Sequence, residues 1–453
     1  MSSTAIYSYV EVVPGGPIHG TIRPPGSKSL TNRALVCAAF ARGRSRLSGA
    51  LQSDDTHVMI EALRQIGIVV IAEDRGRTLV VDGLPETRMS LPGGDRASLF
   101  IGNSGTTIRF LTAALSAYGG SYRLHGVPRM HERPIGDLVD ALTPTCEGMI
   151  TCESTGGCPP VVIETEGWSG SKLQVAGNVS SQYLSGLMMA VPIAKKSAQV
   201  RVIGELVSRP YVEMTATILR DFGAVVHWSN DLHSDHSLVC HIDGTRGYTG
   251  CDYAIEPDAS AASYFWAAAA ISGGEVTVEG LGPDAMQGDV AFVDCLEKMG
   301  CDVVRETNRI TVSGSNQLHG IDIDMNAISD TVQTLCVVAL FANSPTRIRG
   351  VAHNRFKETD RIGDLAIELR KLGAMVSEHE DGMTVQPIAD LSRFSGASLE
   401  TYDDHRMAMS LSLAGLRLRS VRITNPSCTA KTYPDFFADL EKLIGRSHLW
   451  ATP

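Results

Sequence analysis

Two kinds of helix alternate along the chain, and they differ in where their apolar residues stand. The first kind is amphipathic, ends in Leu-x-x-x-Gly or a close variant, and is followed by a short β-rich run. It is found at 58–70, 138–151, 213–226, 291–304, 364–376 and 435–445. Each copy has a glycine where a helix C-terminus favours a positive φ: Gly67, Gly148, Gly223, Gly300, Gly373 and Gly445. These helices are predicted to pack on the outside.

The second kind of helix is apolar on nearly all sides, as in 261–271. Such a helix must be buried. The copies begin near Lys28, Gly105, Ser181, Asp258, Asp330 and Asp404 and run into strand-like stretches such as 275–279. Both patterns recur at intervals of roughly 70 to 80 residues, which marks an internal repeat. The repeating unit reads β-α-β-α-β-β, and six copies account for almost the whole chain.

Six such units exceed what one hydrophobic core can hold, so we predict two domains of three units each. The break is expected at 253–257, where a strand-like segment meets Pro257 before the fourth buried helix. The strand-like residues 7–21 are assigned to the later domain. The predicted domains are therefore 27–255 and 1–26 together with 256–453, and the chain crosses between them twice.

Composition and charge exclude several classes of protein. The chain has 453 residues, and its net charge of −10 argues against non-specific nucleic-acid binding. No apolar run approaches the roughly 20 residues that span a bilayer, and the N-terminus has neither a secretory nor a transit pattern. We expect a cytoplasmic monomer with no nucleic-acid or membrane partner.

The cysteines and histidines do not predict a metal site. None of the ten cysteines forms a C-x-x-C pair, and Cys37, Cys295 and Cys336 stand in apolar helical patterns typical of buried free thiols. The close set 146, 152 and 158 lacks a fourth ligand. The histidines at 227, 233 and 236 surround a polar segment that favours a hairpin turn over a metal site.

The starts of the six apolar helices carry the candidate chemistry. They present Lys28, Ser29 and Arg33; Asn103 to Thr106 with Arg109; Ser180, Ser181 and Gln182; Asp258 and Ser260; Asp330; and Asp403 to Arg406. Capping alone explains the Ser, Asn and Asp residues. It does not explain Lys28, Arg33 and Arg406, because a cation at a helix N-terminus opposes the helix dipole. A bound anion would offset that cost, so we expect the helix starts to face one cleft that binds anionic ligands.

The alternative for 24–33 alone is a simple cap followed by a solvated lysine. A Walker loop is rejected because the first glycine of G-x-x-x-x-G-K-[ST] is missing.

Two loops add charged groups to this set. Residues 131–137 place Arg133 just before a helix, and 353–361 contain Arg355, Lys357 and Arg361 with two acids. Arginine pairs with carboxylate and phosphate oxygens in a bidentate manner, and lysine suits phosphate. Asp330 and Glu358 are the proton-transfer candidates, because they are carboxylates beside many cations.

Further blocks of sequence run in one order from end to end of the chain. They are Pro25-Gly26-Ser27-Lys28-Ser29 with Asn32-Arg33, Gly102-Asn103-Ser104-Gly105-Thr106 with Arg109, Glu132-Arg133-Pro134-Ile135-Gly136-Asp137-Leu138, Asn178-Val179-Ser180-Ser181-Gln182, Asp258-Ala259-Ser260, Lys357-Glu358-Thr359-Asp360-Arg361, Asp404-His405-Arg406-Met407-Ala408 and Cys428-Thr429-Ala430-Lys431-Thr432. Together they resemble the 5-enolpyruvylshikimate-3-phosphate (EPSP) synthase family. The resemblance implies an α/β fold, namely a two-domain inverse α/β barrel in which each domain has three β-α-β-α-β-β repeats.

The resemblance also implies a reaction between phosphoenolpyruvate and shikimate 3-phosphate in the interdomain cleft, without a metal or organic cofactor. The matched shikimate 3-phosphate ligands are Lys28, Ser29, Arg33, Ser180, Ser181, Gln182, Tyr211, Asp330 and Lys357. The matched phosphoenolpyruvate ligands are Lys28, Gly105, Arg133, Gln182, Arg361, Arg406 and Lys431. Asp330 would accept the proton of the attacking hydroxyl, and Glu358 with Lys28 would manage the proton at the methylene carbon.

The sequence departs from the family pattern at a few positions. His353 stands where the family commonly has Asn, with Asn354 next to it, so its contact to the sugar phosphate is in question. Ser104 replaces a common Ala, and Phe110 stands where Pro usually follows the helix arginine.

The sequence disfavours two other functions. UDP-N-acetylglucosamine enolpyruvyl transferase typically has a Cys ahead of its Arg-Pro-Ile helix, and 118–130 contains none. A sliding clamp would need a basic inner face rather than cations beside acids.

Overall fold

The computed structural model describes residues 7–84, 96–230 and 238–452. The chain divides into two compact units. The first unit is Gly26–Ile255, and the second unit is Met1–Pro25 with Glu256–Pro453. The assignment of these units as domains stays a prediction.

The helices of the first unit are α1 (Lys28–Ala39), α2 (Asp54–Gln65), α3 (Gly105–Tyr118), α4 (Gly136–Leu142), α5 (Ser181–Ile193) and α6 (Arg209–Asp221). Its strands are β3 (Ala41–Arg42), β4 (Arg44–Ser48), β5 (Val69–Glu73), β6 (Thr78–Asp82), β7 (Ala97–Phe100), β8 (Gly120–His125), β9 (Cys146–Ser154), β10 (Cys158–Trp168), β11 (Lys172–Ala176), β12 (Ser197–Ile203), β13 (Val225–Asn230), β14 (Leu238–Asp243), β15 (Tyr248–Thr249) and β16 (Asp252–Ala254).

The helices of the second unit are α7 (Ala259–Ser272), α8 (Phe292–Lys298), α9 (Val332–Ala339), α10 (Gly363–Lys371), α11 (His405–Ser412) and α12 (Phe436–Ile444). Its strands are β1 (Tyr9–Val12), β2 (His19–Ile22), β17 (Glu275–Glu279), β18 (Asp302–Glu306), β19 (Arg309–Ser313), β20 (Asp322–Asp324), β21 (Thr346–Arg349), β22 (Val376–His379), β23 (Gly382–Val385), β24 (Ala397–Leu399), β25 (Val421–Thr424) and β26 (Leu449–Ala451).

The described strands form six four-stranded sheets with one shared topology, and β3 and β15 pair as a separate two-stranded sheet. The strand orders are β16-β4-β6-β5, β7-β8-β10-β9, β11-β12-β14-β13, β2-β17-β19-β18, β20-β21-β23-β22 and β24-β25-β1-β26. In each sheet the first two strands are parallel and the other neighbours are antiparallel, as in β7·β8, β8·β10 and β10·β9. Three sheets lie in each unit, which is the arrangement that the β-α-β-α-β-β pattern predicts.

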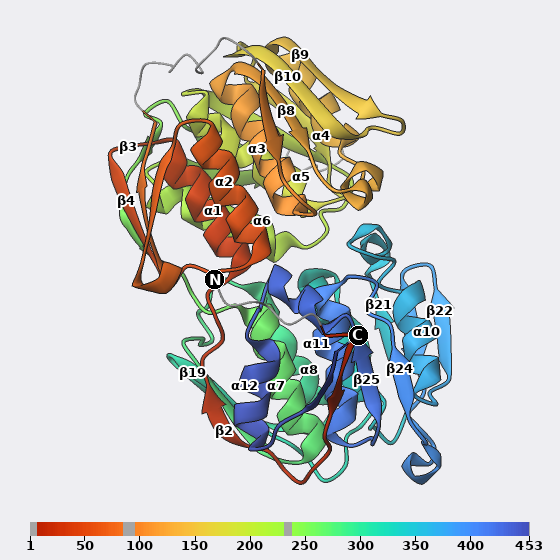
Figure 1. The fold of residues 1–453 in the computed structure, drawn as a ribbon. Helices are drawn as coiled ribbons and strands as arrows, with labels where there is room; N and C mark the ends of the chain where they lie inside the picture. The colour runs from red at the N-terminus through yellow and green to blue at the C-terminus, as the bar shows by residue number, and fades with distance from the viewer. Residues whose placement is uncertain (1–6, 85–95, 231–237, 453) are drawn as a thin grey trace. The chain divides into compact units, whose positions relative to one another are not determined.

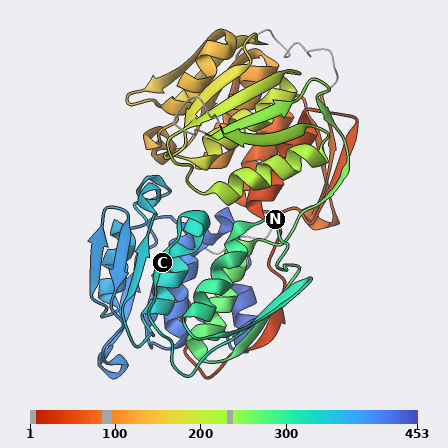
Figure 2. The ribbon, with the colours of Figure 1, turned by 180° about the vertical axis from the view of Figure 1, so that it is seen from behind.

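Three of the repeats are completed by strands from elsewhere in the chain. The predicted single strand at 7–21 is wrong, since two strands form there instead. β1 pairs with β25 and β26, and β2 pairs in parallel with β17. In Figures 1 and 2 the red strand β2 lies beside the green strands of 275–313. Strand β16, at the end of the first unit, similarly completes the sheet of β4.

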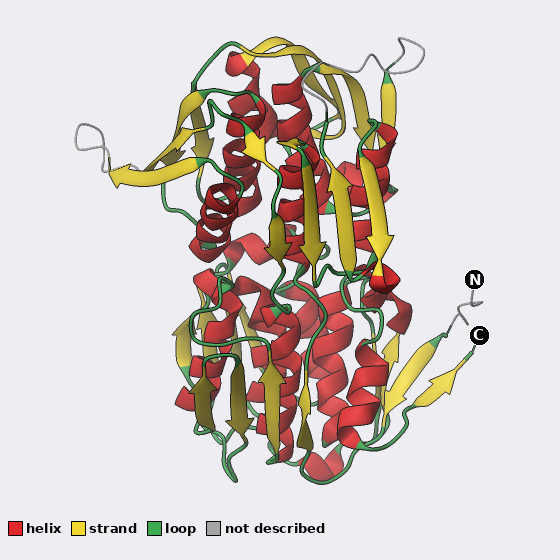
Figure 3. Cartoon of the chain, turned by 90° about the vertical axis from the view of Figure 1, so that its left-hand side faces the viewer, coloured by secondary structure: helices red, strands yellow, loops and turns green. Residues whose placement is uncertain are grey.

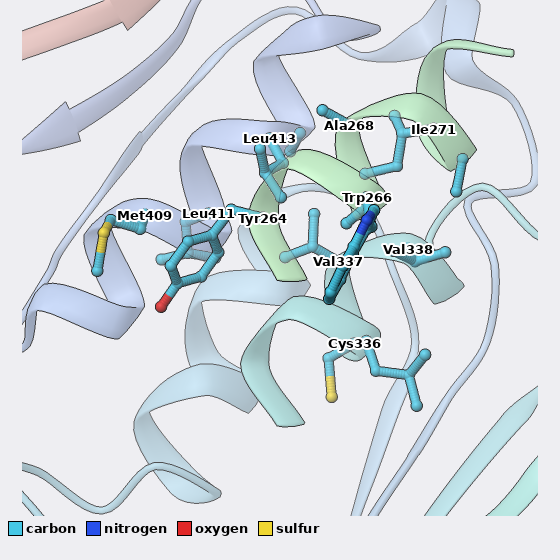
Figure 4. Packing of buried hydrophobic residues seen from close by; sticks show 14 of the residues in the cluster. Tyr264, Trp266, Ala268, Ile271, Cys336, Val337, Val338, Met409, Leu411 and Leu413 are labelled. Carbon is cyan, nitrogen blue, oxygen red and sulfur yellow. The ribbon is translucent and has the colours of Figure 1, made fainter. Parts of the chain in front are cut away.

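The buried and outer helices separate as the hydrophobic pattern predicts. In each unit the helices gather inside and the strands lie around them (Figure 3). Every residue of α7 from Ala259 to Ile271 is buried, so an apolar surface on all sides is required. Figure 4 shows Trp266 of α7 near Val337 and Val338 of α9 and Leu413 just after α11. The indole N–H of Trp266 donates to the carbonyl oxygen of Ile310 at 3.2 Å, which satisfies its one buried donor.

Side-chain caps fix most of the buried helix starts. Ser27, Ser104, Ser180, Asp258 and Asp404 each accept a backbone N–H of the first turn. The helix predicted to start at Asp330 differs. Asp330 lies in a 3-10 turn, η5 (Asn326–Thr331), and α9 follows it without a side-chain cap.

Five of the predicted glycines follow or cap an outer helix with positive φ, but Gly148 lies inside β9 (φ 140°), because α4 ends already at Leu142.

The described helices include none that is long and apolar enough to cross a membrane.

Candidate active site

Arg33 occupies the centre of the helix packing in the first unit. It is 2% exposed. Its Nε donates to the hydroxyl of Thr215 at 2.7 Å, and its Nη1 donates to the carbonyl oxygen of Ser29 at 3.0 Å. Its Nη2 donates to the Ser185 hydroxyl and to the carbonyl oxygen of Tyr211, each at 3.3 Å. Arg33 therefore holds the backbone of two predicted ligands, Ser29 and Tyr211.

All of these partners are neutral. Within the described residues, no carboxylate forms an ion pair with Arg33, and burial lowers its pKa to about 10. Its guanidinium also lies over the ring of Phe110, 5.0 Å from the centroid. A buried cation without a counter-charge is costly, and an anionic ligand would lower that cost.

Gly105 allows two more guanidinium groups to reach the start of α3. A Cβ at this position would lie 2.6 Å from Nη2 of Arg133 and 2.8 Å from Nη1 of Arg109, closer than real contacts allow. Arg133 donates to the carbonyl and side-chain oxygens of Asn103 at 3.1 and 3.3 Å. A side chain at this position would displace both guanidinium groups. With glycine here, two cations converge on a helix N-terminus, which suits an anion.

The start of α5 joins the same group. Arg109 donates to Oε1 of Gln182 at 2.7 Å, and Gln182 Nε2 reaches the Thr106 hydroxyl at 3.5 Å. Ser180 caps the helix by accepting the backbone N–H of Gln182, and Ser181 is the first helical residue. The structure therefore brings Gly105, Arg133, Ser180, Ser181 and Gln182 to adjacent helix starts.

Lys28 is the first residue of α1. Its Nζ lies 3.5 Å from Oδ2 of Asp55, a carboxylate on α2. Both side chains are largely buried, since 12% of Lys28 and 5% of Asp55 is exposed. The predicted position at a helix N-terminus is confirmed, since Ser27 caps α1 and Lys28 follows it directly.

In the second unit, each predicted cation forms an ion pair with a carboxylate. Arg361 is the hub. Its Nε and Nη2 donate to the two carboxylate oxygens of Asp404 at 2.7 and 3.1 Å, and Nη2 also donates to Glu358 at 2.8 Å. Its Nη1 lies 3.3 Å from Oδ1 of Asp330. Burial alone would lower the pKa of Arg361, but Asp404, Glu358 and Asp330 together raise it above its usual value.

The two predicted proton-transfer carboxylates are each held by two or more cations. Asp330 accepts from Arg406 Nη2 at 2.7 Å and lies 3.5 Å from Lys357 Nζ. Glu358 accepts from Lys431 Nζ at 2.9 Å as well as from Arg361. Nearby cations favour the ionised form of a carboxylate. Burial lowers the pKa of Lys357, and Asp330 opposes that shift.

A strained turn presents Asp404 and Arg406. Tyr402 and Asp403 have φ of 53° and 55°, a left-handed conformation that non-glycine residues seldom adopt. The Tyr402 hydroxyl donates to buried Glu368 of α10 at 2.8 Å, and Asn425 Nδ2 donates to Asp403 at 3.1 Å. Strain of this kind persists where surrounding contacts hold it.

The sequence reasoning did not assign a role to Asp404 or Glu368. Asp404 was visible as a helix cap, but its pairing with Arg361, 43 positions earlier, has no sequence signal. Glu368 stands in an ordinary amphipathic helix. Its contact with the Tyr402 hydroxyl becomes visible only in the packing of α10 against the turn.

The cysteines and histidines form no metal site among the described residues. Ten cysteines are free, and Cys37, Cys295 and Cys336 are buried as predicted. The described residues contain no His, Cys, Asp or Glu group suited to a metal ion. His227 stacks on His241 with centroids 4.7 Å apart, while His233 and His236 lie outside the described residues.

His353, the departure from the family pattern, is buried beside Lys357. Burial first, and then the charge of Lys357, lower its pKa to about 4. The folded protein therefore holds the ring neutral at a pH where the unfolded chain already binds a proton. Its neighbour Asn354 is committed elsewhere, since Nδ2 donates to the carbonyl oxygen of Ser329 at 2.9 Å.

The His353→Asn variant is expected to resist acid better than the wild type. The lowered pKa means that His353 costs stability as pH falls from about 6.5 to about 4, by up to about 3 kcal/mol. Urea unfolding at pH 7.5 and pH 4.5 measures this difference, and His319→Asn, at an exposed histidine of the same unit, is the control. Equal losses in His353→Asn and wild type would show that His353 is not held neutral.

Comparison with known proteins agrees with the sequence blocks. The family described as EPSP synthase (3-phosphoshikimate 1-carboxyvinyltransferase) matches residues 12–440. A 3-phosphoshikimate 1-carboxyvinyltransferase of Thiobacillus denitrificans is 46% identical over 425 residues, which cover 92% of this chain and 95% of that protein. The chloroplastic enzyme of Solanum lycopersicum is 44% identical over 94% of this chain and 82% of its own length.

Solved structures give the same result for the fold. EPSP synthase from Acinetobacter baumannii superposes with a TM-score of 0.79 at 26% identity, over 98% of this chain and 100% of that one. The enolpyruvyl transferase NikO from Streptomyces tendae, 20% identical over 98% of this chain and 99% of that one, shares the fold with a TM-score of 0.72. The predicted fold class, the two-domain inverse α/β barrel, is confirmed. The chain belongs to the EPSP synthase family, the 3-phosphoshikimate 1-carboxyvinyltransferases.

Proposed function

We propose that this protein transfers the enolpyruvyl group of phosphoenolpyruvate to the 5-hydroxyl of shikimate 3-phosphate and releases phosphate. It acts as a cytoplasmic monomer without a metal or organic cofactor. Family membership supports the reaction, and the residues that match the family's ligands are present in this chain.

The observation that carries the proposal is the contrast in charge pairing. Among the described residues, the buried Arg33 and Arg109 have only neutral partners. Cations of this kind attract phosphate and carboxylate groups. In the second unit, by contrast, Arg361 and Arg406 hold the carboxylates Asp330 and Glu358, which supplies ionised groups for proton transfer.

The substrate roles are those that the resemblance to the family implies for the matching residues. Shikimate 3-phosphate is bound by Lys28, Ser29, Arg33, Ser180, Ser181, Gln182, Tyr211, Asp330 and Lys357. Phosphoenolpyruvate is bound by Lys28, Gly105, Arg133, Gln182, Arg361, Arg406 and Lys431. Arg33 donates four of its five N–H groups within the protein. It therefore acts on the ligand through its remaining N–H and its charge, and it positions Ser29 and Tyr211 by holding their carbonyl oxygens.

The reaction balances in two steps. First, the 5-hydroxyl oxygen forms a bond to C2 of phosphoenolpyruvate, its proton passes to Asp330, and the methylene carbon C3 gains a proton through Glu358 and Lys28. Second, C3 returns its proton to Glu358, the bond between C2 and the phosphate oxygen breaks as the C2–C3 double bond forms again, and the released phosphate carries away the proton held by Asp330. Cations near the phosphate stabilise the charge that develops on the leaving group.

Substrate choice is tested by phosphate release. We expect release from phosphoenolpyruvate with shikimate 3-phosphate, and none with UDP-N-acetylglucosamine or without an acceptor. A coupled phosphate assay of the purified chain measures all three. Release with the nucleotide sugar alone would contradict the proposal and favour the other enolpyruvyl transferase.

Lys28→Ala is expected to lower kcat/KM by about 30-fold to several thousand-fold, because removing one charge from a buried polar site costs roughly 2–5 kcal/mol. Steady-state kinetics with both substrates measures the change. Lys442→Ala, at a side chain 76% exposed, is the matched control and should retain activity. A kcat/KM of Lys28→Ala near the wild-type value would remove Lys28 from the site.

A further inference from the structure

A buried carboxylate outside the predicted site lies one hydroxyl away from Arg406. Asp289 is 3% exposed and stands in a 3-10 turn, η4 (Gly288–Ala291). The hydroxyl of Ser260 on α7 donates to Oδ2 of Asp289. The oxygen of the same hydroxyl accepts from Nη2 of Arg406 at 3.4 Å. Because Arg406 Nη2 also donates to Asp330 at 2.7 Å, the four groups form one connected chain.

The turn that carries Asp289 is fixed to the start of α7. Gln287 donates through Nε2 to the carbonyl oxygen of Pro257 at 2.6 Å and to Glu256 at 3.1 Å. It also accepts the backbone N–H of Ala259 at 3.1 Å. These contacts hold η4 and the first turn of α7 as one piece, so Asp289 and Ser260 keep their spacing.

We infer that Asp289 is a positioning residue that acts through Ser260 to hold Arg406 against Asp330. An ionised Asp289 can only accept hydrogen bonds, so the single O–H of Ser260 donates to it. The lone pairs of the serine oxygen are then free to accept from Arg406. A protonated Asp289 can instead donate to that oxygen and compete with Arg406. The hold on Arg406 then weakens. This inference rests on the proposed function only for the role of Arg406 as a phosphoenolpyruvate ligand.

The charges around Asp289 support a transition near neutral pH. It faces Asp258 and Ser260 of the α7 start, Asp330 of η5 and Arg406 of α11. Burial first, and then the charge of Asp330, raise its pKa to about 6, while Ser260 and Arg406 oppose the shift. Its protonation therefore changes over the range in which the enzyme can be assayed.

Asp289→Asn is the first variant, because it is close in shape and cannot ionise. At pH 7.5 we expect its KM for phosphoenolpyruvate to rise about threefold to tenfold, because a neutral amide oxygen or N–H replaces the charged acceptor of the Ser260 hydroxyl. Its kcat should change less than its KM. In the wild type the same KM should rise between pH 7.5 and pH 5.5, and in Asp289→Asn this rise should be absent. Asp294→Asn, at a carboxylate 53% exposed in the same unit, is the matched control.

The bridge is tested by a mutant cycle in stability, which needs no turnover. The unfolding free energies in urea of Asp289→Asn, Arg406→Lys and the double variant give their coupling. We expect a larger coupling with Ser260 in place than in the Ser260→Ala background, where only the direct attraction between the two charges remains. The wild type should also lose stability relative to Asp289→Asn as pH rises from 4 to 7, because a raised carboxyl pKa favours the folded state only at low pH.

The inference is overturned if Asp289→Asn keeps the wild-type KM and pH profile, or if the coupling is the same in the Ser260→Ala background. A wild type that releases no phosphate from the two substrates contradicts the proposed function instead. The stability cycle still decides the inference in that case.

Discussion

The buried guanidinium of Arg361 is the interaction on which the second unit depends. It is 2% exposed and makes hydrogen bonds to three carboxylates, those of Asp404, Glu358 and Asp330. Each of these carboxylates belongs to a different part of the chain. Asp404 caps α11, Glu358 precedes α10, and Asp330 precedes α9. One planar cation therefore connects three helix starts through four hydrogen bonds, one more than the three N–H donors of a lysine could make.

The first unit uses the same repeat to a different end. Its sheets share the strand order of the second unit, and its three buried helices also begin at polar caps. Arg33 and Arg109 nevertheless have only neutral partners among the described residues. The unit keeps a surplus of buried positive charge, and the closeness of Arg133 to Gly105 adds to it. One architecture thus contains a unit whose buried Arg33 and Arg109 contact neutral groups and a unit whose Arg361 and Arg406 contact carboxylates.

Much of the fold could be predicted because each level of the sequence agrees with the others. The six apolar helices, the outer helices and most of the glycine stops follow from hydrophobic periodicity and capping alone. The two failures have different causes, one local and one from pairing with distant strands. Gly148 looked like a helix stop because the pattern continued past Leu142, but Pro144 ends the helix early and the glycine lies within β9. The 7–21 segment splits into two strands because its residues pair with two separate sheets.

The site could be predicted less completely. Residues that match a family motif, such as Lys28 and Arg406, can be proposed from the sequence, whereas Asp289, which we infer to act through Arg406, cannot. Asp289 and Glu368 stand in unremarkable segments, and their roles depend on packing across long separations in the chain. Hydrogen bonds such as that of Ser260 to Asp289, 29 positions apart, leave no local pattern.

The most direct test of this account is the unfolding free energy of Arg361→Gln in urea at pH 7.5. The account predicts a loss of about 3–5 kcal/mol, because the variant leaves three partly or fully buried carboxylates without their shared cation. Arg393→Gln, which breaks an ion pair whose arginine is 87% exposed, should change stability by less than about 0.5 kcal/mol. An Arg361→Gln variant as stable as Arg393→Gln would contradict the claim that this guanidinium holds the three helix starts together.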